Sequence, residues 1–245
     1  MLHTPGHAHG VAVSDLTAFV ASGTGGLRAV DVSQPSAPVE VGFVRTPAPH
    51  DVAVARGNAY IAGGEEVLGV VDVSIPSAPA EVGLIGPSPW TFGKGVASSG
   101  SYAFVVLEGS TQASFWSELQ VIDVTTPSAP AIVGTISWPV EIASDVAVSR
   151  GFAYVTSFQS GLHIIDVHTP TAPTELGSLG ASGEAYGVPT GLPWGLELWE
   201  ARRHPTQVYE IIAGLADFLE GNSEEALAQM MSEVEQRPRG LFVDF

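Results

Sequence analysis

The sequence predicts a mainly β protein that is built from repeated units. Three observations support this prediction. One motif returns four times at nearly constant spacing, β-branched and aromatic residues occur in short runs, and Gly, Pro and Ser separate those runs. The chain has 245 residues and is 45% hydrophobic, which is sufficient for a substantial buried core.

The repeated motif is an aspartate between two branched apolar residues, with prolines four and seven positions further on. The four aspartates are Asp31, Asp72, Asp123 and Asp166. Their spacings of 41, 51 and 43 residues indicate a period of about 42, with an insertion of about ten residues in the third copy. That length suits four short strands joined by tight turns, which is one blade of a β-propeller.

The same pattern of apolar runs separated by Gly, Pro and Ser predicts where the strands and copies begin and end. In the second copy, strands are expected at residues 51–55, 59–62, 67–73 and 80–84. The four blades cover about residues 6–44, 45–86, 87–136 and 137–180, and residues 183–188 read as the opening strand of a fifth. This extra strand either pairs with the first blade and closes a ring, or it leaves an open arc. The predicted architecture is therefore a β-propeller-like array of four four-stranded blades plus an extra strand.

The repeat also resembles a known family. A leucine three residues before the motif, as at Leu27, and Asp51-Val52-Ala53-Val54 upstream of the second motif are similar to the LVIVD repeat. The resemblance covers about three quarters of the chain, residues 6–188. It implies a β-propeller, usually in secreted or surface-associated bacterial and archaeal proteins, with no shared activity and no catalytic residues to transfer.

The charge and composition of the chain restrict the classes of partner that we expect. Nine Lys and Arg residues against 26 Asp and Glu residues give a net charge of −17, which repels the phosphate backbone of nucleic acids. The chain has no cysteine, and the first residues show neither a basic start nor an apolar run. We therefore expect no nucleic-acid partner, no membrane insertion and no signal peptide in this chain, and its compartment stays open.

The last part of the chain has a different pattern. After a linker at residues 189–203, apolar residues such as Val208, Ile212 and Leu219 recur at helical spacing, and a second stripe follows Ser223. Residues 204–245 are thus expected to form an α-helical hairpin. This tail resembles the terminal helices of TatD-type hydrolases. It lacks the catalytic residues of that family, so packing or association is its expected role.

The four repeated aspartates invite a calcium or acid–base interpretation. Because each copy has one at the same place, just before a turn, the sequence favours a structural role in which the carboxylate accepts turn N–H groups. Residues that depart from the repeat are better candidates for a functional site, since a structural residue should recur in every blade.

One such departure is a set of aromatic residues on loops that should emerge on the same side of the array. They are Trp90, Phe92, Phe115, Trp116 and Trp138, and the third-copy insertion at residues 109–116 supplies two of them. An aromatic loop face is a plausible platform for a protein or a glycan. The alternative is that these rings only cover the irregular third blade.

The second departure concerns the opening strands, which line the axis of a propeller. Alignment places His9, His50, Lys94, Ser144 and Tyr186 at one position, and Gly10, Asp51, Gly95, Asp145 and Gly187 at the next. The potential ligands of a divalent metal are His7, His9, His50, Asp51 and Asp145. The alternative is that these residues are solvated or hydrogen-bonded polar groups, and no cofactor is predicted.

Three functions follow from these features. The first is a non-enzymatic propeller module that binds a protein or glycan through the aromatic loop face. The second is a metal-dependent hydrolase or lyase at the channel mouth, with His9 and His50 as ligands and Asp51 or Asp145 as base. The third is a truncated or fused propeller fragment without an activity of its own.

Overall fold

The computed structural model describes residues 5–64, 66–87, 90–111, 114–158 and 160–180, and the strand Ala185–Gly187. Apart from the short 3₁₀ helix η1 (Gly23–Gly25), these residues form strands and the turns between them. The predicted linker and helical hairpin lie outside the described residues. No helix in the described part of the chain has the length and apolar character needed to cross a membrane.

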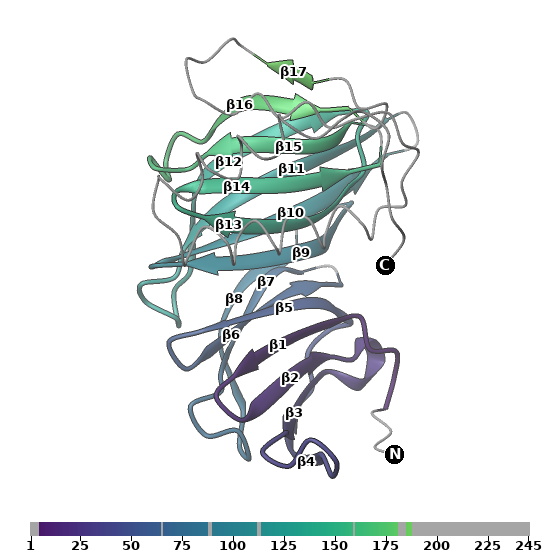
Figure 1. Ribbon diagram of the computed structural model, residues 1–245, viewed down its shortest axis with the longest axis vertical. Helices are drawn as coiled ribbons and strands as arrows, with labels where there is room; N and C mark the ends of the chain where they lie inside the picture. The colour runs from purple at the N-terminus through teal and green to yellow at the C-terminus, as the bar shows by residue number, and fades with distance from the viewer. Residues whose placement is uncertain are drawn as a thin grey trace, which may run out of the picture. The chain divides into compact units, whose positions relative to one another are not determined.

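Four antiparallel sheets follow one another along the chain (Figure 1). The first contains β1 (Gly10–Ser14), β2 (Thr17–Ala21), β3 (Leu27–Asp31) and β4 (Val39–Val44). The second contains β5 (Pro49–Ala55), β6 (Asn58–Gly63), β7 (Glu66–Asp72) and β8 (Ala80–Pro87). The third contains β9 (Thr91–Ser99), β10 (Tyr102–Ser110), β11 (Phe115–Asp123) and β12 (Ala131–Pro139). The fourth contains β13 (Ala143–Ser149), β14 (Phe152–Ser157), β15 (Gly161–Asp166) and β16 (Thr174–Leu179).

In each sheet the strands pair in chain order, as the repeat predicts, and the four strands of the second copy lie where the sequence places them. Tight hairpins make this order possible. Arg56 and Gly57 have φ angles of 53° and 74°, and Arg150 and Gly151 have 50° and 80°. Two consecutive positive φ angles match the twist of the strands on either side, which is why two-residue turns of this kind join antiparallel strands.

The extra strand does not pair with the first sheet. β17 (Ala185–Gly187) pairs antiparallel with β16, so the fourth sheet has five strands. Of the two alternatives that the sequence leaves open for this segment, pairing with the first blade is not the one that the structure shows. The physical reason is that β16 is an edge strand, which offers unpaired backbone N–H and C=O groups to the segment that follows it closely in the chain.

The core consists of three apolar layers, each between two consecutive sheets. Phe19 and Leu27 of the first sheet pack with Val52 and Ile61 of the second, and equivalent clusters join the second sheet to the third and the third to the fourth. The opening strands lie next to one another, because β1 contacts β5, β5 contacts β9 and β9 contacts β13. Among the described strands, β13 has its extensive contacts with β9, β10 and β14 and not with β1.

The repeated aspartates have the structural role that the sequence favours. Each carboxylate accepts a hydrogen bond from the backbone N–H two positions further on: Ser33 for Asp31, Ser74 for Asp72, Thr125 for Asp123 and His168 for Asp166, over 2.8–2.9 Å. Hydrogen bonds from that same residue lower the pKa of all four carboxyl groups. These aspartates start the turn between the third and fourth strands.

Candidate functional site

The opening strands bring the predicted histidines together. His9 lies directly before β1 and His50 lies in β5, and their rings stack with centroids 4.9 Å apart and planes 15° from parallel. His50 Nδ1 donates a hydrogen bond to the carbonyl oxygen of Lys94 in β9, over 2.9 Å. Thus three consecutive sheets are connected at this end of their opening strands, as the alignment of His9, His50 and Lys94 predicts.

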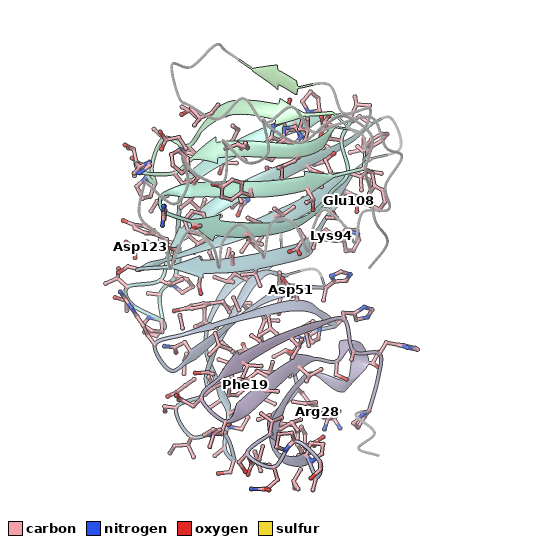
Figure 2. The ribbon with its side chains drawn as sticks, viewed as in Figure 1. Phe19, Arg28, Asp51, Lys94, Glu108 and Asp123 are labelled. Carbon is pink, nitrogen blue, oxygen red and sulfur yellow. The ribbon has the colours of Figure 1, made fainter. Side chains whose placement is uncertain are left out.

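The aspartates at the next position fit against glycines. A Cβ atom on Gly10 would overlap Asp51, and a Cβ atom on Gly95 would overlap Asp145, so each carboxylate lies against the bare backbone of the preceding opening strand. Asp51 Oδ2 also accepts a hydrogen bond from the backbone N–H of Val96 in the following sheet, over 2.8 Å. Asp51 therefore bridges the opening strands on both sides of its own (Figure 2).

Burial perturbs both carboxyl groups. Burial away from solvent raises the pKa of Asp51. Hydrogen bonds from the backbone N–H groups of Val96 and Val52 and the charge interaction with His50 lower this pKa, but their effect is smaller than that of burial. Burial and, second, the negative charge of Asp51 raise the pKa of Asp145 to about 6. Asp145 Oδ1 accepts a local backbone hydrogen bond, from Val146 over 2.8 Å. Within the described part of the chain, no following sheet gives Asp145 an N–H donor such as the one that Val96 gives Asp51.

The metal hypothesis has no three-ligand cluster to rest on. No three His, Asp or Glu side chains converge as metal ligands in the described residues. His7 and His9 are exposed, His50 is tied to the Lys94 carbonyl, and Lys94 itself pairs with Glu108, its Nζ 2.7 Å from Oε2 (Figure 2). The arrangement that the structure does show is a row of stacked and hydrogen-bonded polar groups that holds the opening strands together.

The aromatic candidates gather at one end of the third sheet. Phe92 lies opposite Glu108, Gly109 lies opposite Trp116, and Ser117 lies opposite Trp138 in the register of β9 to β12. Both ends of the insertion belong to strands, since β10 extends to Ser110 and β11 starts at Phe115. All five positions lie at one end of the third sheet, and four of the five are in strands rather than in the loops that the sequence predicts.

Their exposure differs widely. Trp90 is 72% exposed and Phe92 is 48% exposed, whereas Phe115 and Trp116 are half-buried. The Trp116 ring lies against Gly109, where a Cβ atom would overlap it. Because directly opposed residues share a face, Phe92 and Trp116 point to opposite faces of the sheet. The five rings therefore do not form one continuous platform.

Trp138 is a core residue. It is 6% exposed and packs with Phe104, Val106 and Val146 between the third and fourth sheets. Its Nε1–H donates a hydrogen bond to Glu175 Oε2, over 2.8 Å. The expectation that Trp138 belongs to an exposed partner-binding loop is wrong, because β12 continues through this position and directs the ring towards the next sheet.

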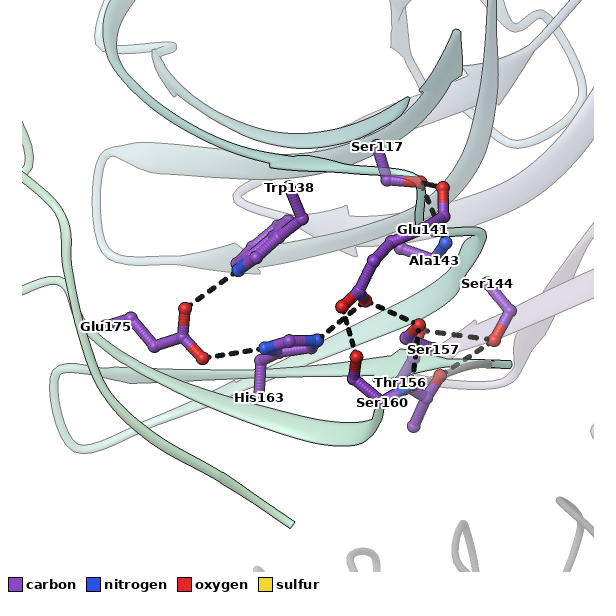
Figure 3. A network of polar contacts seen from close by, with 10 residues as sticks. All are labelled: Ser117, Trp138, Glu141, Ala143, Ser144, Thr156, Ser157, Ser160, His163 and Glu175. Carbon is purple, nitrogen blue, oxygen red and sulfur yellow. Dashed lines mark hydrogen bonds and ion pairs between the residues drawn. The ribbon is translucent and has the colours of Figure 1, made fainter. Parts of the chain in front are cut away.

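Sequence reasoning missed a buried polar network beside Trp138 (Figure 3). His163 is 3% exposed, and its ring lies 4.9 Å from the Trp138 ring. His163 Nδ1 is 2.7 Å from Glu175 Oε1, and its Nε2 is 2.9 Å from Glu141 Oε2. The position of His163 is occupied by Arg28, Gly69 and Gln120 in the other copies, so the departure from the repeat was the available signal.

Glu141 is the centre of this network. It accepts hydrogen bonds from Ser157 Oγ, over 2.7 Å, and from Ser160 Oγ, and its own carbonyl accepts one from Ser117 Oγ, over 2.9 Å. Burial raises the pKa of Glu141, but hydrogen bonds from Ser160, Ser157 and His163 lower it, and the net shift is downward. Both ring nitrogens of His163 face carboxylates, so neither is available to take a proton from a substrate. The network is suited to joining the third and fourth sheets.

In the described part of the chain, the fold and these sites define a β-sheet repeat protein whose polar clusters connect neighbouring sheets. The LVIVD repeat model matches residues 5–46, 49–85, 93–137 and 142–180, and the chain belongs to the LVIVD repeat family. That match does not extend to the tail. A comparison with curated protein sequences finds no match.

Two solved structures of similar fold are computationally designed proteins. The Ika8 protein is similar with a TM-score of 0.54 and 9% identity over 76% of this chain, and this chain covers 59% of that protein. The Ika4 protein is similar with a TM-score of 0.50 and 7% identity, over 65% of this chain and 91% of that protein. At such identities the likeness concerns the fold alone.

Proposed function

We propose that this protein is a non-enzymatic interaction module that binds a protein or glycan through Trp90 and Phe92. The supporting observation is the exposure of both rings at the end of the third sheet, where the neighbouring aromatic residues are half-buried or buried. Large aromatic surfaces supply much of the contact energy in protein interfaces, and an exposed pair on a rigid support loses little side-chain entropy on binding.

The backbone holds this pair in place. The carbonyl oxygen of Trp90 accepts a hydrogen bond from the N–H of Ser110, over 3.0 Å, and Phe92 lies in a regular pair with Glu108. Trp90 has a φ angle of 66°, and Val140, at the equivalent position before the next opening strand, has one of 59°, so this conformation belongs to the turn between consecutive sheets. The Trp90 ring lies on that turn and is 72% exposed.

The test compares wild-type protein with Trp90→Ala and Phe92→Ala on a glycan array and on a displayed library of random peptides. Phe158→Ala is the matched control, because Phe158 is similarly exposed but follows β14 in the fourth sheet. We expect binding to one ligand class that falls at least tenfold in each third-sheet variant and is unchanged in the control. Ligands that bind all four proteins equally would contradict the proposal.

A further inference from the structure

The first and fourth sheets each have one face whose equivalents in the other sheets pack against a neighbouring sheet. We call the side of a sheet that packs on the following sheet its forward face, and the side that packs on the preceding sheet its backward face. Each of the three apolar layers joins one forward face to one backward face. Within the described residues, the backward face of the first sheet and the forward face of the fourth have no such neighbour.

Several apolar positions of these end faces are less buried than their equivalents, although Val30 on the backward face of the first sheet is only 5% exposed. On the backward faces, Val52, Val96 and Val146 are at most 7% exposed, but the equivalent Val11 is 62% exposed. On the forward faces, Leu27, Leu68 and Leu119 are fully buried, but the equivalent Leu162 is half-buried. Tyr154 is likewise half-buried, although its equivalents Phe19, Tyr60 and Phe104 are buried. Both end faces therefore retain the residues of a sheet–sheet contact.

The opening strands carry a second, polar element of the same contact. The position that holds Gly10, Asp51, Gly95 and Asp145 alternates between glycine and aspartate, and a valine follows each of them. Asp51 accepts its hydrogen bond from the valine of the following sheet, Val96. Among the opening strands of the four sheets, Asp145 is the last residue of this series, because Gly187, which the sequence aligns next, lies in β17 and pairs with Gly177 of β16. A following sheet that continues the alternation would offer glycine followed by valine. The first sheet offers this pair in Gly10 and Val11.

The outer strands carry a third element. Gly42, Gly83 and Gly134 each lie against the carbonyl oxygen of a motif proline in the following sheet, namely Pro76, Pro127 and Pro170, and a Cβ atom at any of these glycines would overlap that oxygen. The fourth sheet has Gly177 at this position, and the first sheet has Pro35 in the equivalent turn. Gly177 and the Pro35 turn thus belong to the two end sheets, and Gly177 lies opposite Gly187 of β17 within its own sheet.

We infer that the forward face of the fourth sheet binds the backward face of the first sheet of a second copy of this chain. The inner, middle and outer parts of the two end faces all repeat the contact that joins consecutive sheets within one chain. Such a head-to-tail contact closes into a ring when its rotation is completed. Two copies contribute eight sheets, which is within the four to eight blades typical of propellers, whereas three copies exceed that number. The assembly is a ring of two chains, with Val11 N–H of one copy donating to Asp145 of the other.

The test is the mass of the full chain by multi-angle light scattering after gel filtration, over a range of concentrations in about 0.15 M salt. Wild-type protein is expected at twice the 25.4 kDa of one chain. Val11→Asp and Val13→Asp place a charge on the backward face and are expected at the mass of one chain with an unchanged far-ultraviolet circular dichroism spectrum. Ile75→Asp is the control, because Ile75 is as exposed as Val11 but lies in a turn. The equivalent turn position holds a polar residue in the other three copies, namely Gln34, Thr126 and Thr169. The Ile75→Asp variant is expected to remain at twice the chain mass.

Several results would overturn the inference. A wild-type mass of one chain at every concentration would show that the faces do not bind a second copy. An unchanged double mass in Val11→Asp and Val13→Asp would place the contact elsewhere, and a mass that rises beyond two copies would exclude the closed pair. Loss of the β-sheet spectrum in both variants would show that one chain already buries this face.

Discussion

Replacement of Trp138 by alanine should reduce stability without affecting the proposed binding surface. The substitution removes a buried ring from the layer between the third and fourth sheets, for which a loss of about 3–5 kcal/mol in the free energy of unfolding is typical. Trp138→Phe keeps most of the ring but removes the Nε1–H donor of Glu175. Hydrogen bonds to charged groups contribute about 1.5–3 kcal/mol, so this variant should have an intermediate loss.

The measurement is urea denaturation followed by far-ultraviolet circular dichroism, at one protein concentration for all variants. Trp90→Ala is the control, since an exposed ring outside the core should change the unfolding free energy by no more than about 0.5 kcal/mol. The reasoning is refuted if Trp138→Ala costs no more than Trp90→Ala. It is also refuted if Trp138→Phe is as stable as wild-type protein.

Two further predictions concern the contacts between sheets. The first prediction uses the Val11→Asp variant, which is expected to be a single chain. Because the pKa of Asp145 is raised from 3.8 to about 6 in the folded chain, the folded state binds more protons than the unfolded state between these pH values. The free energy of unfolding should therefore fall as pH rises through that range. Asp145→Asn should remove this fall and stabilise the chain at pH 7.5 by up to about 3 kcal/mol, and equal effects at pH 4 and 7.5 in chemical denaturation would contradict the assignment. Gly83→Ala should cost about 1–3 kcal/mol, because its Cβ atom meets the Pro127 carbonyl oxygen. Gly86→Ala in the same strand meets nothing within 4 Å, and equal melting temperatures for the two variants would refute the close contact.

Much of the fold could be predicted because the repeat is local. The spacing of Asp31, Asp72, Asp123 and Asp166 marks the same turn in each copy, and Gly and Pro punctuation separates strands whose pairing partners are neighbours in the chain. The alignment of the opening strands also predicted which residues lie side by side, as the stacked rings of His9 and His50 show. Each of these inferences needs only strand order and register.

The candidate site was harder to predict because burial depends on residues that are distant in the sequence. Trp90 and Trp138 look alike as tryptophans near the starts of the third and fourth copies. One is exposed, and the other donates a hydrogen bond to Glu175, which is 37 residues away. The network of Glu141, His163 and Glu175 combines single residues from three segments. No short motif marks it.

By itself, the sequence determined the unit of this protein: a four-stranded sheet of about 42 residues, repeated four times, with a turn aspartate in every copy. Strand alternation and turn chemistry act over a few residues, so they are written into each copy separately. Only the tertiary structure decided which rings are exposed, how Asp51 bridges two neighbouring sheets, and that Ala185–Gly187 pairs with β16 rather than with the first sheet. Those outcomes depend on which face or edge a neighbouring sheet covers, and that is a property of packing rather than of any one repeat.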